Sequence, residues 1–187
     1  MASPDEGALV RAPYTVIGYH GCDARVAERL LDGEPFRLSE NEYDWLGDGA
    51  YYWEYAPFRA YEWARELHGD NRAVLKAEIV LGTCLNLLDT THFTGLQRAY
   101  ADVAQAFASS GARMPANRRG RNRLDRLVVN ELCDSLAAEQ VYFDTVRGCF
   151  PEGVPLFEGS QLLSQTHVQI AVRNPSCIGA LELVKFD

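Results

Sequence analysis

Two short stretches, Gly18-Tyr19-His20-Gly21-Cys22 and Trp45-Leu46-Gly47-Asp48-Gly49-Ala50-Tyr51-Tyr52-Trp53, decide how this 187-residue chain is interpreted. The first closes a β-type run over residues 14–19, so a His-Gly pair stands at the end of a predicted strand. The second is a glycine turn among aromatic residues. Glycine allows close approach of the backbone, and aromatic rings offer flat faces. The two stretches predict a pocket for a planar, amide-bearing ring such as nicotinamide; the alternative is that the rings are core packing and the histidine is structural.

The rest of the chain mixes helical and β-type patterns without regular alternation, which predicts one α+β domain over residues 1–187. The first twelve residues are expected to be a flexible N-terminus. The first helix is expected to begin after Asp23 as its N-cap and to stop at Gly33, and the second to cover residues 58–67 after Pro57. Two more helices are expected over residues 94–109 and 124–132. Strands are expected over 73–81, ending at Gly82, and over 141–146, 167–172 and 178–184.

Composition excludes several classes of protein. Hydrophobic residues make up 47% of the chain and charged residues 24%, as in a folded soluble domain. No apolar stretch approaches the roughly 18 residues of a membrane span, and no signal peptide is visible, so we expect a cytoplasmic protein without membrane contact. The five cysteines are scattered and fit reduced thiols, and no metal-site spacing, Walker loop or HExxH motif occurs.

The arginines are unevenly distributed. The net charge of −8 disfavours general attraction to nucleic acid, yet six arginines lie between residues 113 and 126, next to a Gly-, Pro- and Ser-containing loop. Arg118, Arg119 and Arg121 are candidates to bind phosphates, since guanidinium groups pair with them bidentately. The alternative is that this segment is a solvated loop, whose positive charge balances the acidic remainder of the chain or binds the carboxylates of a partner protein.

Three segments resemble the poly(ADP-ribose) polymerase and diphtheria-toxin branch of the ADP-ribosyltransferases, which places a His, a Tyr and usually a Glu around NAD. The first segment is Tyr19-His20-Gly21. The second is Gly47-Asp48-Gly49-Ala50-Tyr51-Tyr52, followed by Ala60-Tyr61-Glu62-Trp63-Ala64. The third is His167-Val168-Gln169-Ile170-Ala171-Val172-Arg173-Asn174. The matches occur in the family's order, and the resemblance implies a split antiparallel β-sheet core with peripheral helices and NAD as substrate.

The resemblance also assigns roles to residues of the first two segments. His20 would hydrogen-bond the ribose hydroxyls on the adenosine side of NAD, and Gly21 would offer its backbone N–H and C=O to the nicotinamide carboxamide. Tyr51 and Trp63 would stack on the two faces of the nicotinamide ring, with Gly49 beside them in the NAD site. The family's usual small hydroxyl residue falls where Ala60 stands, which removes one expected hydrogen bond.

The third segment departs from the family, because Gln169 stands where the glutamate would be. A carboxylate there stabilises positive charge on the ribose, whereas a neutral amide keeps only the hydrogen bond. His167, two residues earlier and on the same strand face, is a candidate hydrogen-bond donor or base for the acceptor. Glu158 is a second candidate carboxylate, and Arg147 a candidate pyrophosphate contact.

The resemblance therefore implies a mono-ADP-ribosyltransferase that modifies a protein or nucleic acid. Such an enzyme needs no metal, and it would suit a bacterial toxin or defence effector with an antitoxin or inhibitor protein as partner. Members without the glutamate are expected to transfer single units or to be inactive. An NAD glycohydrolase and a catalytically silent NAD- or ADP-ribose-binding domain are the alternatives.

Overall fold

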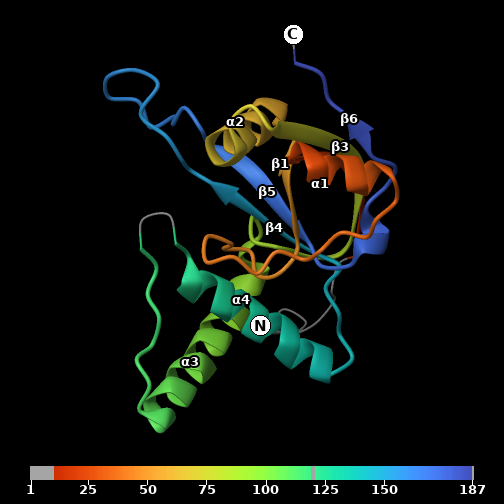
Figure 1. The fold of residues 1–187 in the computed structure, drawn as a ribbon. Coiled ribbons are helices and arrows are strands. Elements are labelled where there is room, and N and C mark those ends of the chain that lie inside the picture. The colour runs from red at the N-terminus through yellow and green to blue at the C-terminus, as the bar shows by residue number, and fades with distance from the viewer. Residues whose placement is uncertain (1–10, 119–120, 187) are drawn as a thin grey trace.

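The computed structural model describes residues 11–118 and 121–186, and it confirms an α+β chain with a mostly antiparallel sheet (Figure 1). The helices are α1 (Ala24–Leu31), α2 (Pro57–His68), α3 (Phe93–Ser110) and α4 (Arg123–Ala138), with short 3₁₀ turns at Thr90–His92 and Pro175–Cys177. The strands are β1 (Arg11–Asp23), β2 (Ala50–Glu54), β3 (Arg72–Asn86), β4 (Thr145–Phe150), β5 (His167–Val172) and β6 (Glu182–Leu183). Residues 1–10 of the expected flexible N-terminus lie outside the described residues, while residues 11 and 12 already pair with β3.

The strand pairings form a closed circuit, β1-β2-β5-β4-β3, that returns to β1, with β6 on the outer edge of β3. Only the β3–β4 pairing is parallel among the described strands. The β1–β2 ladder is short and consists of the pairs Gly18↔Glu54 and Tyr19↔Trp53. The two strands therefore separate from His20 onward, at the position of the His-Gly pair.

Local sequence explains where the first two helices begin. The side chain of Asp23 accepts a hydrogen bond from the backbone N–H of Arg25 at 2.8 Å and caps α1, as expected. Pro57 is the first residue of α2, where its missing N–H leaves no hydrogen bond unmade. Helix α1 packs on Leu75 and α2 packs on Val74. Because neighbouring residues of a strand point to opposite sides, the two helices cover opposite faces of β3.

Three expected strands differ from the observed ones. Strand β3 does not end at Gly82 but bends there, because Gly82 has a φ of +59° and the carboxylate of Asp144 accepts the next backbone N–H, that of Thr83, at 2.9 Å. Residues 141–144 precede β4 instead of forming it. Of residues 178–184, the strand β6 keeps only Glu182–Leu183, and Ile178 makes an isolated bridge to Ile79.

Helices α3 and α4 form a separate layer below the strands in Figure 1. Ala99 of α3 and Val129 and Leu132 of α4 share a buried cluster with Val146 of β4 and Ala171 of β5. The far end of α3 extends away from the strands, and the arginine-containing segment returns along it to α4 (Figure 1). This segment therefore starts far from the sheet and ends beside it.

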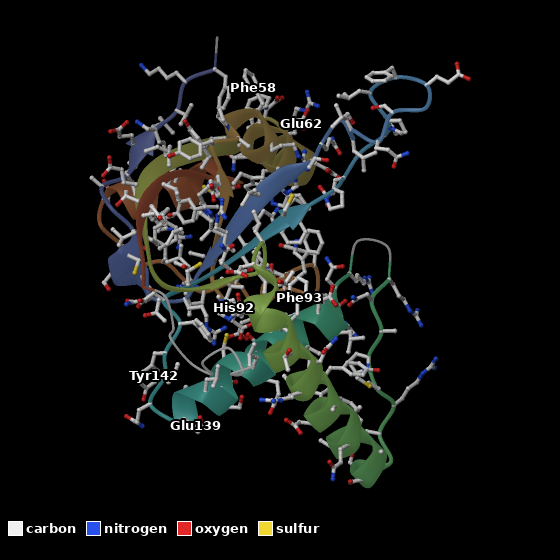
Figure 2. All side chains as sticks on the ribbon, turned by 180° about the vertical axis from the view of Figure 1, so that it is seen from behind. Phe58, Glu62, His92, Phe93, Glu139 and Tyr142 are labelled. Carbon is white, nitrogen blue, oxygen red and sulfur yellow. The ribbon has the colours of Figure 1, made fainter. Side chains whose placement is uncertain are left out.

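The connection between β4 and β5 is a hairpin that projects from the body of the protein (Figures 1 and 2). A bridge between Pro155 and Leu163 and backbone hydrogen bonds from Leu156 to Leu162 and from Ser164 to Val154 give it a regular core. We call residues 151–166 the β4–β5 hairpin.

Candidate functional site

One cavity of about 310 Å³ collects most of the residues that the sequence singled out. Its wall includes the predicted NAD-site residues His20, Gly21, Gly49, Tyr51, Trp63 and Gln169. These residues come from β1, the turn before β2, β2, α2 and β5. A volume of this size lies at the lower end of the range for small-molecule sites, roughly 300–1,000 Å³.

His20 bridges the gap where β1 and β2 separate. Its Nδ1 lies 2.8 Å from the backbone carbonyl oxygen of Tyr51. A carbonyl only accepts, so Nδ1 carries the proton and donates it. Burial lowers the pKa of His20 below its usual value, which keeps the ring neutral. A neutral imidazole has one N–H, so Nε2 of His20 is a hydrogen-bond acceptor.

The hydroxyl of Tyr51 is fully engaged within the glycine turn. It donates to the carbonyl of Gly47 at 2.7 Å and accepts from the backbone N–H of Leu46 at 3.0 Å. Burial raises the pKa of Tyr51, so the hydroxyl keeps its proton. What Tyr51 presents to the cavity is therefore its ring. Trp63 stands in the same wall, with its ring 5.3 Å from that of Tyr43 and 5.9 Å from that of Trp53.

The glycines of the two motifs are required by packing. A Cβ on Gly21 would lie 2.2 Å from the carbonyl oxygen of Ala60 in α2, and one on Gly49 would lie 3.0 Å from Ala171 in β5. Gly47 has a φ of +79°, and a Cβ there would lie 2.5 Å from Oδ1 of Asn130. The close approach that these glycines allow is to the protein itself: it brings α2 and β5 against the motifs that line the cavity and α4 against the glycine turn.

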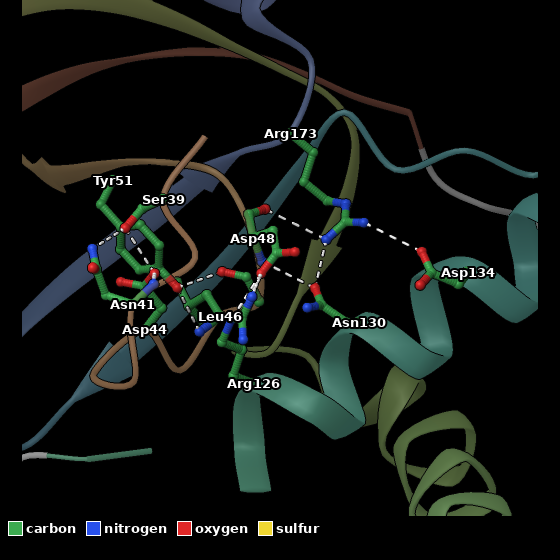
Figure 3. A network of polar contacts seen from close by, with 11 residues as sticks. Ser39, Asn41, Asp44, Leu46, Asp48, Tyr51, Arg126, Asn130, Asp134 and Arg173 are labelled. Atoms are coloured by element: carbon green, nitrogen blue, oxygen red, sulfur yellow. Dashed lines mark hydrogen bonds and ion pairs between the residues drawn. The ribbon is translucent and has the colours of Figure 1, made fainter. Parts of the chain in front are cut away.

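The glycine turn is fastened to α4 by a polar network (Figure 3). Asp48 pairs with Arg126 at 2.7 Å, and its backbone N–H donates to Oδ1 of Asn130 at 3.0 Å. Arg173, just after β5, donates to the same Asn130 oxygen at 3.0 Å and pairs with Asp134 at 3.6 Å. The turn that carries Tyr51 is therefore held by both α4 and the end of β5.

Gln169 is oriented by a tryptophan. Nε1 of Trp45 donates to Oε1 of Gln169 at 3.2 Å. The indole N–H only donates, so it selects the amide oxygen and turns the amide NH₂ of Gln169 away from itself. Beside Trp45, the buried carboxylate of Asp44 accepts from the hydroxyl of Ser39 at 2.7 Å and the backbone N–H of Asn41 at 2.6 Å. Burial raises the pKa of Asp44, and its role is to shape the loop that carries Trp45.

His167 is not part of the cavity wall. It is 6% exposed, and its ring lies 6.3 Å from that of Trp53 and 5.9 Å from that of Phe150. Its Nδ1 lies 2.6 Å from the carbonyl of Gln165, and its buried Nε2 has no partner among the residues that the structure describes. Burial lowers the pKa of His167. His167 shares a strand face with Gln169, but the two aromatic rings enclose it.

Two further sequence-based candidates lie elsewhere. Glu158 is exposed in the β4–β5 hairpin and does not line the cavity. Arg147 of β4 forms a bidentate ion pair with Glu54 of β2, with Nε and Nη2 at 2.5 and 2.7 Å from the two carboxylate oxygens. The carboxylate of Glu54 therefore neutralises the charge of Arg147. Glu158 and Arg147 thus lie outside the wall of the cavity that holds the other candidates, and their predicted roles stay predictions.

The cavity instead contains an ion pair that the sequence did not indicate. Nη2 of Arg59, in α2, lies 3.1 Å from Oε2 of Glu152, the second residue of the β4–β5 hairpin. Arg59 also pairs with Glu62 at 2.7 Å. Arg59 and Glu152 are 93 positions apart, and neither belongs to a motif, so only the fold brings them together.

The arginine segment reaches the edge of the cavity through Asn122, which lines it. Arg121 and Arg123 both pair with Glu42, and Arg118 and Arg121 exchange backbone hydrogen bonds of 2.8 and 2.7 Å. Arg119 lies outside the described residues. Together with Arg126, which pairs with Asp48, Arg121 and Arg123 thus neutralise acidic residues of the loop before β2. Binding of phosphate by Arg118, Arg119 and Arg121 stays a prediction.

Two further searches covered the described residues. Among residues 11–118 and 121–186, no group of three or more His, Cys, Asp or Glu side chains is arranged to hold a metal ion. In the same part of the chain, no helix combines the length and apolar character that crossing a membrane requires.

The chain is similar to an uncharacterized protein of Methanocaldococcus jannaschii. The two are 26% identical in an alignment of 187 positions that covers 88% of this chain and 85% of the relative. No protein-family model and no solved structure matches the chain.

Proposed function

We propose that this protein is an NAD-dependent mono-ADP-ribosyltransferase that modifies a macromolecule, with an ADP-ribosyltransferase-like split sheet. The observation that carries the proposal is the convergence of three distant motifs on one cavity, with Nε2 of His20 as an acceptor at its wall. The opening between β1 and β2 beyond Tyr19 is where a sheet split would lie.

The cavity wall carries groups suited to the nicotinamide end of NAD and to the adjoining ribose. Nε2 of His20 accepts from a hydroxyl of the ribose on the adenosine side, and the rings of Tyr51 and Trp63 provide faces for the pyridinium. Stacking of this kind is worth about 1 kcal/mol beyond the buried area. The adenine end of NAD extends past the cavity, because about 310 Å³ is too small to enclose the whole molecule.

The reaction breaks the bond between C1′ of the ribose and the pyridinium nitrogen, and the electron pair leaves with nicotinamide. An oxygen or nitrogen of the acceptor then bonds to C1′ and loses its proton to a base or to water. Neutral nicotinamide, ADP-ribosylated acceptor and one proton are the products. Positive charge builds on the ribose in the transition state, so negative charge near C1′ accelerates the step.

The neutral amide of Gln169 favours a second candidate, a catalytically silent domain that binds NAD or ADP-ribose groups. Trp45 holds this amide in one orientation, as a binding site requires. Such a domain would bind NAD and leave it intact.

Incubation of the protein with NAD labelled in its ADP-ribose part, in the presence of total cell RNA, DNA and protein, separates these functions. Label transferred to one of the three fractions supports the transferase, and free ADP-ribose identifies a glycohydrolase. Unchanged NAD refutes both enzymatic functions. His20→Ala should abolish turnover, whereas His92→Ala, outside the cavity, should not.

A further inference from the structure

Among the described residues, three carboxylates line the cavity, and two of them hold turns or helix ends of the protein itself. Asp23 caps α1 and accepts from the side chain of Asn71. Asp44 is 2% exposed and holds the turn at Ser39 and Asn41. The third, Glu152, has a side chain that is 44% exposed and is held only at its tip, in the ion pair with Arg59.

The backbone of Glu152 is fixed although its side chain is accessible. Its carbonyl accepts from the backbone N–H of Gln165 at 3.0 Å, which joins the two ends of the β4–β5 hairpin. Two residues later, His167 begins β5, and Nδ1 of His167 lies 3.9 Å from the Glu152 carboxylate. Glu152 is therefore placed at the start of the strand that carries Gln169.

Unpartnered polar atoms gather at this end of the cavity. Among the described residues, the buried indole N–H of Trp53, which lines the cavity, has no acceptor. Nε of Arg59, also in the wall, is buried with no partner in the same part of the chain. Buried donors without partners are rare in folded proteins and call for an explanation such as a functional role. These atoms are independent of the motifs and point to the same region as Glu152.

We propose that Glu152 supplies the carboxylate that Gln169 lacks. The assignment rests on the proposed function. The carboxylate faces the ribose of bound NAD, stabilises the positive charge that develops as the C1′–nitrogen bond breaks, and takes the proton that the acceptor releases. Arg59 is a positioning residue that directs Glu152 into the cavity. Gln169 contributes hydrogen bonding only.

The test compares two glutamates of the same hairpin. In Glu152→Gln, kcat for nicotinamide release should fall by on the order of 100-fold, the usual effect of removing one electrostatic contact of the transition state. The Kd for NAD should change less than about threefold, and thermal stability should be retained. Glu158→Gln, the same change at an exposed position outside the cavity, should leave kcat and Kd unchanged.

Each outcome has one meaning. If the wild type releases nicotinamide and Glu152→Gln does so within twofold of its rate, the assignment of Glu152 is overturned while the proposed function stands. If the wild type does not cleave NAD, whether or not it binds it, the proposed transferase function fails, and this inference with it. If Glu152→Gln does not fold, Glu152→Asp decides: a lower kcat at unchanged Kd supports the assignment, and a wild-type kcat overturns it.

Discussion

The indole N–H of Trp45 donates to the side-chain oxygen of Gln169 at 3.2 Å, joining the loop before β2 to β5 across 124 positions. This contact holds the side-chain oxygen of Gln169 on Trp45 and so fixes the orientation of the amide group. It also survives replacement of the amide by a carboxylate, since a carboxylate oxygen accepts the same hydrogen bond. The charge at this position can therefore be changed without loss of the Trp45 contact.

Gln169→Glu is expected to accelerate nicotinamide release by about tenfold or more, because a carboxylate in the cavity adds electrostatic stabilisation of the ribose cation. Steady-state assays of nicotinamide release measure the effect. Gln161→Glu adds the same charge at an exposed position of the β4–β5 hairpin and should not change the rate. An equal rate for Gln169→Glu and wild type would show that position 169 lies away from the reacting carbon.

Gly21→Ala is expected to destabilise the fold by about 1–3 kcal/mol, because the added Cβ would lie 2.2 Å from the carbonyl oxygen of Ala60. Urea unfolding measures the change. Gly95→Ala is the contrast, since it places a Cβ 3.3 Å from a side-chain atom of Leu132 within a helix, where alanine is favoured. Wild-type stability of Gly21→Ala would contradict the close packing of β1 on α2.

Arg126→Met is expected to weaken NAD binding and to lower stability by up to about 1 kcal/mol, because it removes the ion pair that fastens Asp48 and the glycine turn to α4. Arg123→Met is the matched control on the same helix, since Arg123 pairs with Glu42 and its side chain is 53% exposed. Calorimetric titration with NAD compares the two. Equal affinities would show that the turn does not depend on this pair.

Acidification below about pH 6.5 is expected to destabilise the protein. Burial lowers the pKa of His20 and of His167, so each takes up its proton more readily in the unfolded chain. The unfolded state then binds more protons, and each histidine that stays neutral when folded costs up to about 1.4 kcal/mol per pH unit below 6.5. The raised pKa of Asp44 acts with the opposite sign and nearer to the acid range of carboxyl groups. Urea unfolding at pH 7.5 and 5.5 measures the difference, and equal stabilities would contradict the buried neutral state of both rings.

Sequence patterns located most of the secondary structure and six of the cavity residues. The capped start of α1, the proline at the start of α2 and the bounds of β5 are local features, so local sequence determined them. The sequence predicts a strand end at Gly82 and not a bend, because the contact that holds the bend comes from the distant carboxylate of Asp144. Only the fold reveals this contact.

The site shows the same division between local and long-range information. His20 and Tyr51 belong to short motifs, whereas the pair of Arg59 and Glu152 joins α2 to the β4–β5 hairpin without any motif. His167 follows the alternation rule along β5, yet the rings of Trp53 and Phe150 enclose it. Alternation gives the strand face of a residue, and packing decides whether the residue reaches a cavity.

Saturation-transfer NMR on NAD mixed with the wild-type protein tests most directly whether the cavity takes the nicotinamide end. We predict the strongest transfer to the nicotinamide ring protons, from the rings of Tyr51 and Trp63, and its loss in Trp63→Ala. No transfer to NAD, or transfer confined to the adenine protons and unchanged in Trp63→Ala, would contradict the assignment of the cavity.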